Sequence, residues 1–217
     1  MTIRKLPINR NSTKETLYVK VQKIISSIPD RKLAIHEFTG LLGSEGLLIL
    51  ISLLSLFFLI PVSVPGVSTA FGLVIFFISI SYILGKGLWL PKSTRYKTIS
   101  GEKISAVLQK GLKWIQQIER ISKPYRMNKL ITNKISDKIN GISILLGSLL
   151  LMLPLGFLPF SNTFPAIAIL FFSIGILQKD GIIIILGHLT NFASIIYFTL
   201  FFSTINATAK QLFNSVL

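Results

Sequence analysis

Hydrophobic and polar positions divide this chain into long uncharged runs separated by basic blocks. Residues 46–85 and 139–178 contain no Asp, Glu, Lys or Arg, and neither do residues 181–209. Forty uncharged residues in a row are rare in a soluble core but ordinary in helices that enter a bilayer. The pattern therefore predicts an all-α integral membrane protein.

The first uncharged run is interrupted in its middle by "PVSVPGVST". Pro61 and Pro65 lack a backbone N–H and end the preceding helix, while Gly66 permits a tight turn. Ser68 or Thr69 is expected to cap the helix that follows. The run thus predicts a Pro-broken helical hairpin.

The two arms of this hairpin, 46–60 and 68–84, are short for membrane spans. At 1.5 Å per residue they reach roughly 22–26 Å, against a hydrocarbon core about 30 Å thick. The hairpin is therefore either re-entrant or a thin pair of spans, and its turn needs shelter or water because bare backbone is unstable in lipid. Glu45 and Lys86 end the arms on one side and are expected to pair.

The second uncharged run repeats the plan at an offset of 93 residues. Pro61 then aligns with Pro154, Gly72 with Pro165, and Lys86 with Lys179. This similarity predicts a duplicated hairpin in a parallel-type repeat, although two apolar hairpins could also have converged. Pro165 suits the first turn of its helix.

Amphipathic segments flank the runs. Residues 14–28 read as a helix, and "LAIHEFTGLLG" as a second short helix. A basic amphipathic helix is predicted between the hairpins, with its apolar stripe formed by Ile104, Val107, Leu108, Leu112, Ile115, Ile118 and Ile121. It either lies in the lipid headgroup plane or packs on the N-terminal helices as a soluble element.

A last apolar segment, 182–205, is long enough to cross once, with Asp180 placed to cap it and Gly181 to open it. The expected organisation is 1–45 as cytoplasmic amphipathic helices, 46–85 as the first hairpin, 86–138 as a basic cytoplasmic or interfacial segment, 139–178 as the second hairpin, 181–205 as the transmembrane helix, and 206–217 as a tail.

Charge sets the expected orientation. Of 23 Lys and Arg, 21 lie in residues 1–46 and 86–138, and the formal net charge is +15. Basic blocks beside apolar runs are typical of loops that face the cytoplasm and anionic headgroups, so lipid is the expected partner and nucleic acid is not. The chain has no cysteine and no evident signal peptide. We expect a multi-pass protein of the bacterial cytoplasmic membrane with its N-terminus inside.

Five motifs in this order resemble the ExoD family of bacterial membrane proteins, over roughly residues 32–200. They read "PVSVPGVSTAFG" (Pro61, Pro65, Gly66, Ser68, Gly72), "GKGLWLP" (Gly85, Trp89, Leu90, Pro91), "IERISKPYR" (Glu119, Arg120, Pro124, Arg126), "LPFSNTFP" (Pro159, Asn162, Pro165) and "KDG" (Asp180, Gly181). The resemblance implies a membrane protein associated with exopolysaccharide synthesis. It implies no reaction.

Few residues suggest chemistry. His188 is the one titratable side chain short of tyrosine in its apolar run, and bonding to a neighbouring helix explains it better than function does. Asn162 could line a polar pocket opposite Ser68 and Thr69, or simply serve its turn.

A possible contact with an anionic headgroup is formed by Glu119, Arg120 and Arg126, although a solvated face explains them as well. With two histidines and no paired carboxylates in the runs, neither a metal site nor a cofactor is expected.

Three functions are compatible with this chain. The first is an accessory protein of exopolysaccharide synthesis with no catalytic chemistry of its own, acting with that machinery and able to form a homodimer. The second is a small transporter or channel with a site between the two Pro-rich turns. The third, an enzyme acting on lipid-linked sugar, is disfavoured because the sequence offers no acid pair, metal ligands or nucleophile triad.

Overall fold

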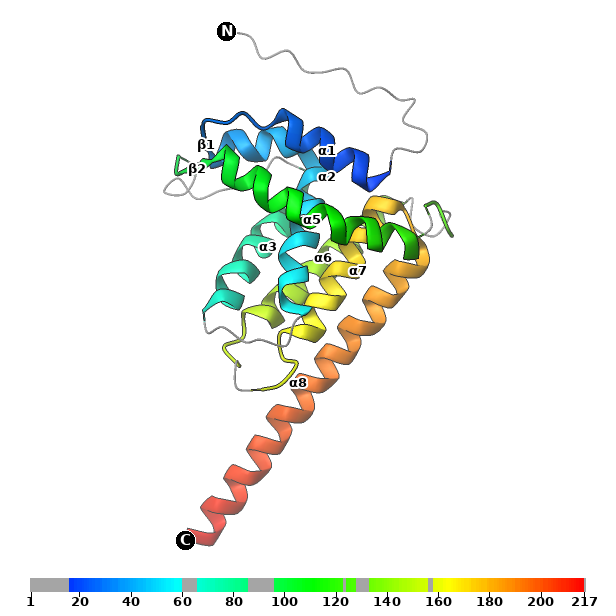
Figure 1. Cartoon of the computed structure of the whole chain (residues 1–217). Helices are drawn as coiled ribbons and strands as arrows, with labels where there is room; N and C mark the ends of the chain where they lie inside the picture. Colours follow the sequence, from blue (N-terminus) through cyan, green and yellow to red (C-terminus); the bar gives the residue numbers. More distant parts are fainter. Residues whose placement is uncertain are drawn as a thin grey trace.

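The computed structural model describes residues 16–59, 66–85, 96–122, 124–127, 133–155 and 158–216. Helices dominate this part of the chain, as Figure 1 shows. In order, the elements are α1 (Leu17–Ser27), β1 (Lys32–Ala34), α2 (Ile35–Leu56), the 3-10 turn η1 (Phe57–Leu59), α3 (Val67–Leu84), β2 (Thr98–Ser100), α5 (Gly101–Ile121), α6 (Lys134–Met152), α7 (Thr163–Gln178) and α8 (Gly181–Val216).

Membrane character follows from the helices themselves. Among the described residues, four helical stretches are long and apolar enough to cross a bilayer: Ile35–Leu59, Val67–Leu84, Ile135–Met152 and Gly181–Asn214. The sixteen residues of α7 form a shorter apolar helix beside them. The all-α membrane class expected from the sequence is confirmed at this level.

The two arms of the first hairpin pack on the second hairpin rather than on each other. α3 packs mainly on α6, and α2 packs mainly on α7, while α2 and α3 touch each other only slightly. Gly72 makes the close approach of α3 to α6 possible, because a Cβ there would lie 2.6 Å from Met152 Cγ and 3.1 Å from the Ser148 carbonyl oxygen. The bundle therefore depends on contacts between the two uncharged runs.

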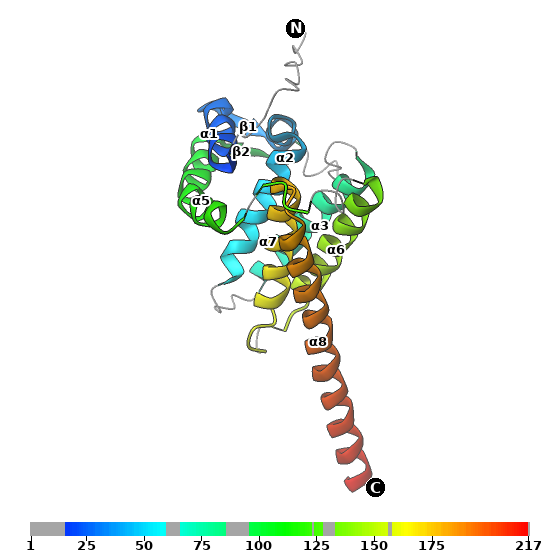
Figure 2. The ribbon, with the colours of Figure 1, turned by 90° about the vertical axis from the view of Figure 1, so that its right-hand side faces the viewer.

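α1 and α5 form a layer over one end of the bundle (Figures 1 and 2). Leu17 and Val21 of α1 are buried with Ile49 of α2 and Ile115 of α5 in one apolar cluster. The basic amphipathic helix α5 packs on α1 of the N-terminal arm, and its position in the lipid headgroup plane stays a prediction. Val107 of the predicted stripe remains more than half exposed, and so does Trp114, which lies outside the stripe.

The short helix expected in "LAIHEFTGLLG" begins slightly later than predicted. Lys32–Ala34 pairs as β1 with β2, antiparallel, and a helix then begins at Ile35. A kink at Gly43, with φ 59° and ψ −170°, separates this short helix from the first hairpin arm within α2. Glu45 binds Lys20 of α1, with Nζ to Oε2 at 2.9 Å, because α1 folds back over α2. Lys86, its expected partner, lies outside the described residues.

α8 is longer than predicted. It covers 36 residues, about 54 Å at 1.5 Å per residue, and passes well beyond the other helices (Figure 1). The segment expected as a tail, 206–217, is helical as far as Val216, since no helix breaker follows residue 205.

Candidate functional site

The first turn is only partly described. Pro61 and Pro65 lie outside the described residues, but Gly66 has a φ of 83° and stands at the N-cap of α3, as its predicted role requires. The predicted side-chain cap is wrong, because neither Ser68 nor Thr69 fills that position. Thr69 instead donates from Oγ1 to the Met152 carbonyl of α6 at 3.4 Å, which ties the first turn to the second hairpin.

The second turn is held by α8. The Tyr197 hydroxyl of α8 donates to the Pro159 carbonyl at 2.5 Å. Asn162 is buried at the N-cap of α7 without a side-chain cap bond, and Pro165 lies buried in the first turn of that helix. The expected meeting of Asn162 with Ser68 stays a prediction.

An ion pair joins the loop after α5 to the corner between α7 and α8. Arg126 donates from Nε to Asp180 Oδ1 at 3.2 Å and from Nη2 to Oδ2 at 2.9 Å. The Asp180 side chain is fully buried, whereas the Arg126 side chain keeps 33% of its surface exposed. Two parallel bonds between a guanidinium and a carboxylate give both strength and a defined orientation.

Backbone contacts fix the same corner. Gly181 donates its N–H to the Arg126 carbonyl at 2.8 Å, and Tyr125 donates to the Gln178 carbonyl at 3.1 Å. Asp180 also caps α8 as predicted, since its Oδ1 accepts from the Ile182 N–H at 3.0 Å. Tyr125 has a φ of 64°, an unusual value for a residue with a side chain, which the surrounding bonds hold in place.

This corner changes the reading of the expected headgroup contact. Arg126 is committed to Asp180, while Arg120 is exposed in the last turn of α5. The Glu119 side chain lies outside what the structure describes. Arg126 therefore has a packing role that its position in the sequence did not reveal.

His188 bonds to a neighbouring helix, as favoured from the sequence. Its Nε2 lies 3.3 Å from Asn140 Oδ1 on α6, and its ring meets Phe172 of α7 edge-on at 4.7 Å. One turn further along α8, Asn191 donates from Nδ2 to the Ser143 carbonyl at 3.0 Å. These bonds make a polar strip between α6 and α8.

A hollow of about 180 Å³ opens on this strip. It is lined by Ser136, Ile139, Asn140, Gly181, Ile184, Ile185 and His188. Asn140 is 2% exposed, and its Nδ2 has no hydrogen-bond partner. Sequence reasoning missed Asn140 and Asn191, although an Asn inside an uncharged run is a recognisable signal.

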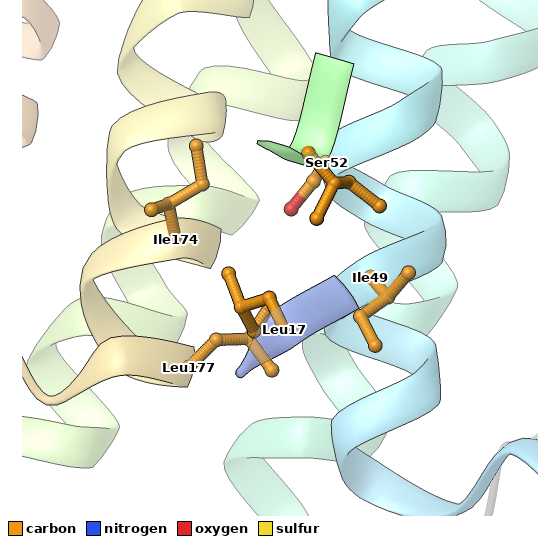
Figure 3. A pocket seen from close by; sticks show the side chains of 6 residues that line it. Leu17, Ile49, Ser52, Ile174 and Leu177 are labelled. Carbon is orange, nitrogen blue, oxygen red and sulfur yellow. The ribbon is translucent and has the colours of Figure 1, made fainter. Parts of the chain in front are cut away.

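A second, smaller void lies among α1, α2, α5 and α7. Figure 3 shows Ser52 beside Ile49, Leu17, Ile174 and Leu177 around it. Its volume of about 10 Å³ is at the limit for one water molecule, and its walls are apolar. Ser52 Oγ donates to Ser173 Oγ at 2.8 Å, so this hydroxyl joins α2 to α7. The void is a packing feature and offers no ligand site.

Across the described residues, His, Asp and Glu form no group of three that could hold a metal ion. The remaining candidate chemistry is therefore hydrogen bonding at the hollow and charge pairing at the Arg126–Asp180 corner.

Comparison with known proteins decides the family. A family model described as "Exopolysaccharide synthesis, ExoD" matches residues 17–200. The chain belongs to the ExoD family.

Two curated relatives are similar over much of the chain. Protein ExoD of Rhizobium meliloti (strain 1021) is 41% identical over 175 residues, which cover 81% of this chain and 72% of the relative. An uncharacterized protein of Synechocystis sp. (strain ATCC 27184 / PCC 6803 / Kazusa) is 33% identical over 136 residues, covering 62% of each. No solved structure matches.

Proposed function

We propose that this protein supports exopolysaccharide synthesis as a multi-pass protein of the bacterial cytoplasmic membrane, without catalytic chemistry of its own. The observation that carries the proposal is membership of the ExoD family over residues 17–200. Three buried polar side chains support the non-catalytic part. Ser52, Asn191 and Asp180 each bond to a neighbouring element and so hold helices together.

We also propose that the hairpins form a parallel repeat related by a twofold axis along the bundle. Such a repeat equates α2 with α6 and α3 with α7, so it exchanges the α2–α7 contact with the α3–α6 contact. These are the dominant contacts of the two hairpins with each other, which supports the proposal.

The second hairpin turn is proposed to be re-entrant. Its Pro159 carbonyl binds Tyr197, sixteen residues after the start of α8, which is about 24 Å along that helix. A bilayer core is about 30 Å thick, and α8 continues for a further 19 residues. The turn would then lie inside the far leaflet, with α8 as its shelter.

Orientation follows from charge in this proposal. The layer of α1 and α5 carries basic side chains, including Lys20, Lys110 and Lys113, and we place it on the cytoplasmic side. Anionic headgroups, the exopolysaccharide machinery and a second copy of the chain are the partners that we propose for it.

The test is deletion of the gene in its own bacterium, followed by measurement of secreted exopolysaccharide. We expect a lower or altered yield, restored by the wild-type gene. Unchanged exopolysaccharide in the deletion strain would contradict the proposal. The transport alternative predicts instead that purified protein in liposomes carries a solute across the bilayer. If such flux were measured and were absent from protein-free liposomes, the transport function would be preferred to the accessory role.

A further inference from the structure

The hollow between α6 and α8 has the features of a ligand site rather than a packing defect. Its volume of about 180 Å³ is far above the roughly 10–15 Å³ that one water molecule requires. Asn140 lines it, and the Nδ2 of this residue is a buried donor without a hydrogen-bond partner. A buried polar group without a partner costs about 1–3 kcal/mol, so an acceptor in the hollow would remove a real penalty.

The depth and opening of the hollow suit a lipid headgroup. Asn140 and His188 lie about 10 Å along α6 and α8 from the starts of these helices. The bond of Asn191 to the Ser143 carbonyl closes the space on the deeper side. Ile139 and Ile185 line the hollow and are both more than 40% exposed on the outer surface of two candidate spans, so the opening faces lipid.

The lining selects the kind of headgroup. Its polar lining residues are Asn140, His188 and Ser136, and it contains no Lys, Arg, Asp or Glu. Phosphate sites normally use a charged donor, most often Arg or Lys. Uncharged groups that both donate and accept instead match hydroxyl groups, which do the same.

We propose that this hollow binds the uncharged, hydroxyl-bearing headgroup of a membrane glycolipid, with a headgroup oxygen accepting from Asn140 Nδ2. The biological meaning of this binding rests on the proposed role in exopolysaccharide synthesis. The binding itself is measured on purified protein and does not depend on that role. A negative binding result therefore leaves the genetic test untouched, and the reverse also holds.

The experiment uses the absence of cysteine in the chain. An Ile185→Cys variant of the full chain carries one environment-sensitive fluorophore at the hollow. It is purified without sugar-headed detergents, which could occupy the site, and placed in phosphatidylcholine nanodiscs. Monoglucosyl diacylglycerol is then added in increasing mole fraction, with diacylglycerol, phosphatidylglycerol and soluble methyl glucoside as parallel probes.

We expect a saturable response to the glucosyl lipid and little response to the other three probes. Adding Asn140→Leu should weaken the response at least about fivefold, which is the fold-change for one net hydrogen bond. Asn206→Leu, the same change on the exposed far part of α8, should leave it unchanged.

Ile139→Trp covers the case in which Asn140→Leu does not fold. This residue is exposed at the mouth of the hollow, so the larger ring should block entry without disturbing the core. Equal responses to the glucosyl lipid and to diacylglycerol or phosphatidylglycerol would overturn the proposal. So would a wild-type response in a folded Asn140→Leu variant or in Ile139→Trp.

Discussion

Arg126 and Asp180 show how one residue pair can organise a corner of this protein. The carboxylate is fully buried, accepts two bonds from the guanidinium, and also caps α8. Removing the arginine would take from a buried charge the counter-ion that the structure describes for it, a change that typically costs about 3–5 kcal/mol. The partial exposure of Arg126 lowers this cost, because water can reach the site.

We therefore expect Arg126→Ala to reduce the free energy of unfolding by up to about 3 kcal/mol. Arg120→Ala is the matched control, since it removes the same charge from an exposed site on α5. Thermal unfolding in detergent measures both. Equal melting temperatures for the two variants would show that the ion pair contributes little.

Gly66 is a second residue with a sharp requirement. Its φ of 83° is unfavourable for residues with a Cβ, and a Cβ there would meet no atom within 4 Å. Gly66→Val should therefore destabilise the protein by about 1–2 kcal/mol through backbone strain alone. Gly40→Val is the control, because Gly40 has equally open surroundings and lies in a helix. A Gly66→Val variant as stable as Gly40→Val would remove the strain argument.

At the scale of elements, the pairing of arms between hairpins is the main feature. Ser52 of α2 and Ser173 of α7 join the runs with a hydroxyl contact of 2.8 Å, in the middle of the bundle. Close serines of this kind let helices associate where lipid removes the hydrophobic driving force.

A double variant, Ser52→Cys with Ser173→Cys, should form a disulfide on mild oxidation, because its sulfur atoms would start near bonding distance. The pair Ser52→Cys with Ser203→Cys is the control, as Ser203 is exposed in the C-terminal half of α8. Gel mobility after protease cleavage between the cysteines reports the crosslink. Failure of the first pair together with success of the second would contradict the packing of α2 on α7.

At the scale of the whole molecule, the main feature is the direction in which α8 extends. The α1–α5 layer lies at one end, whereas α8 extends past the bundle at the other (Figure 2). With 21 of 23 basic residues in 1–46 and 86–138, the layer should face the cytoplasm and the end of α8 the opposite side.

Single cysteines test this arrangement. Lys110→Cys on α5 and Lys210→Cys on α8 replace exposed lysines of the two ends. An impermeant maleimide added to intact cells should label position 210 and spare position 110, and both should react once the membrane is opened. Labelling of position 110 in intact cells would reverse the proposed orientation.

The class and most helices were predictable from the sequence because they depend on local pattern. Uncharged runs, prolines and the spacing of apolar residues indicated the hairpin arms, and α3 and α7 follow them closely. Pro165 and Asp180 also occupy the helix starts assigned to them, since these preferences are properties of a single turn.

What only the tertiary structure decided is which distant segments meet. Arg126 and Asp180 are 54 positions apart in the sequence, and Asn140 and His188 are 48 positions apart. No local pattern could have paired them. Glu45 pairs with Lys20 because α1 lies beside α2. Lys32–Ala34 forms a strand because β2 lies beside it. The sequence by itself determined a membrane protein of helical hairpins, since periodicity and breakers act within a few residues. The polar hollow and the ion-paired corner depend on long-range packing, which no short-range pattern encodes.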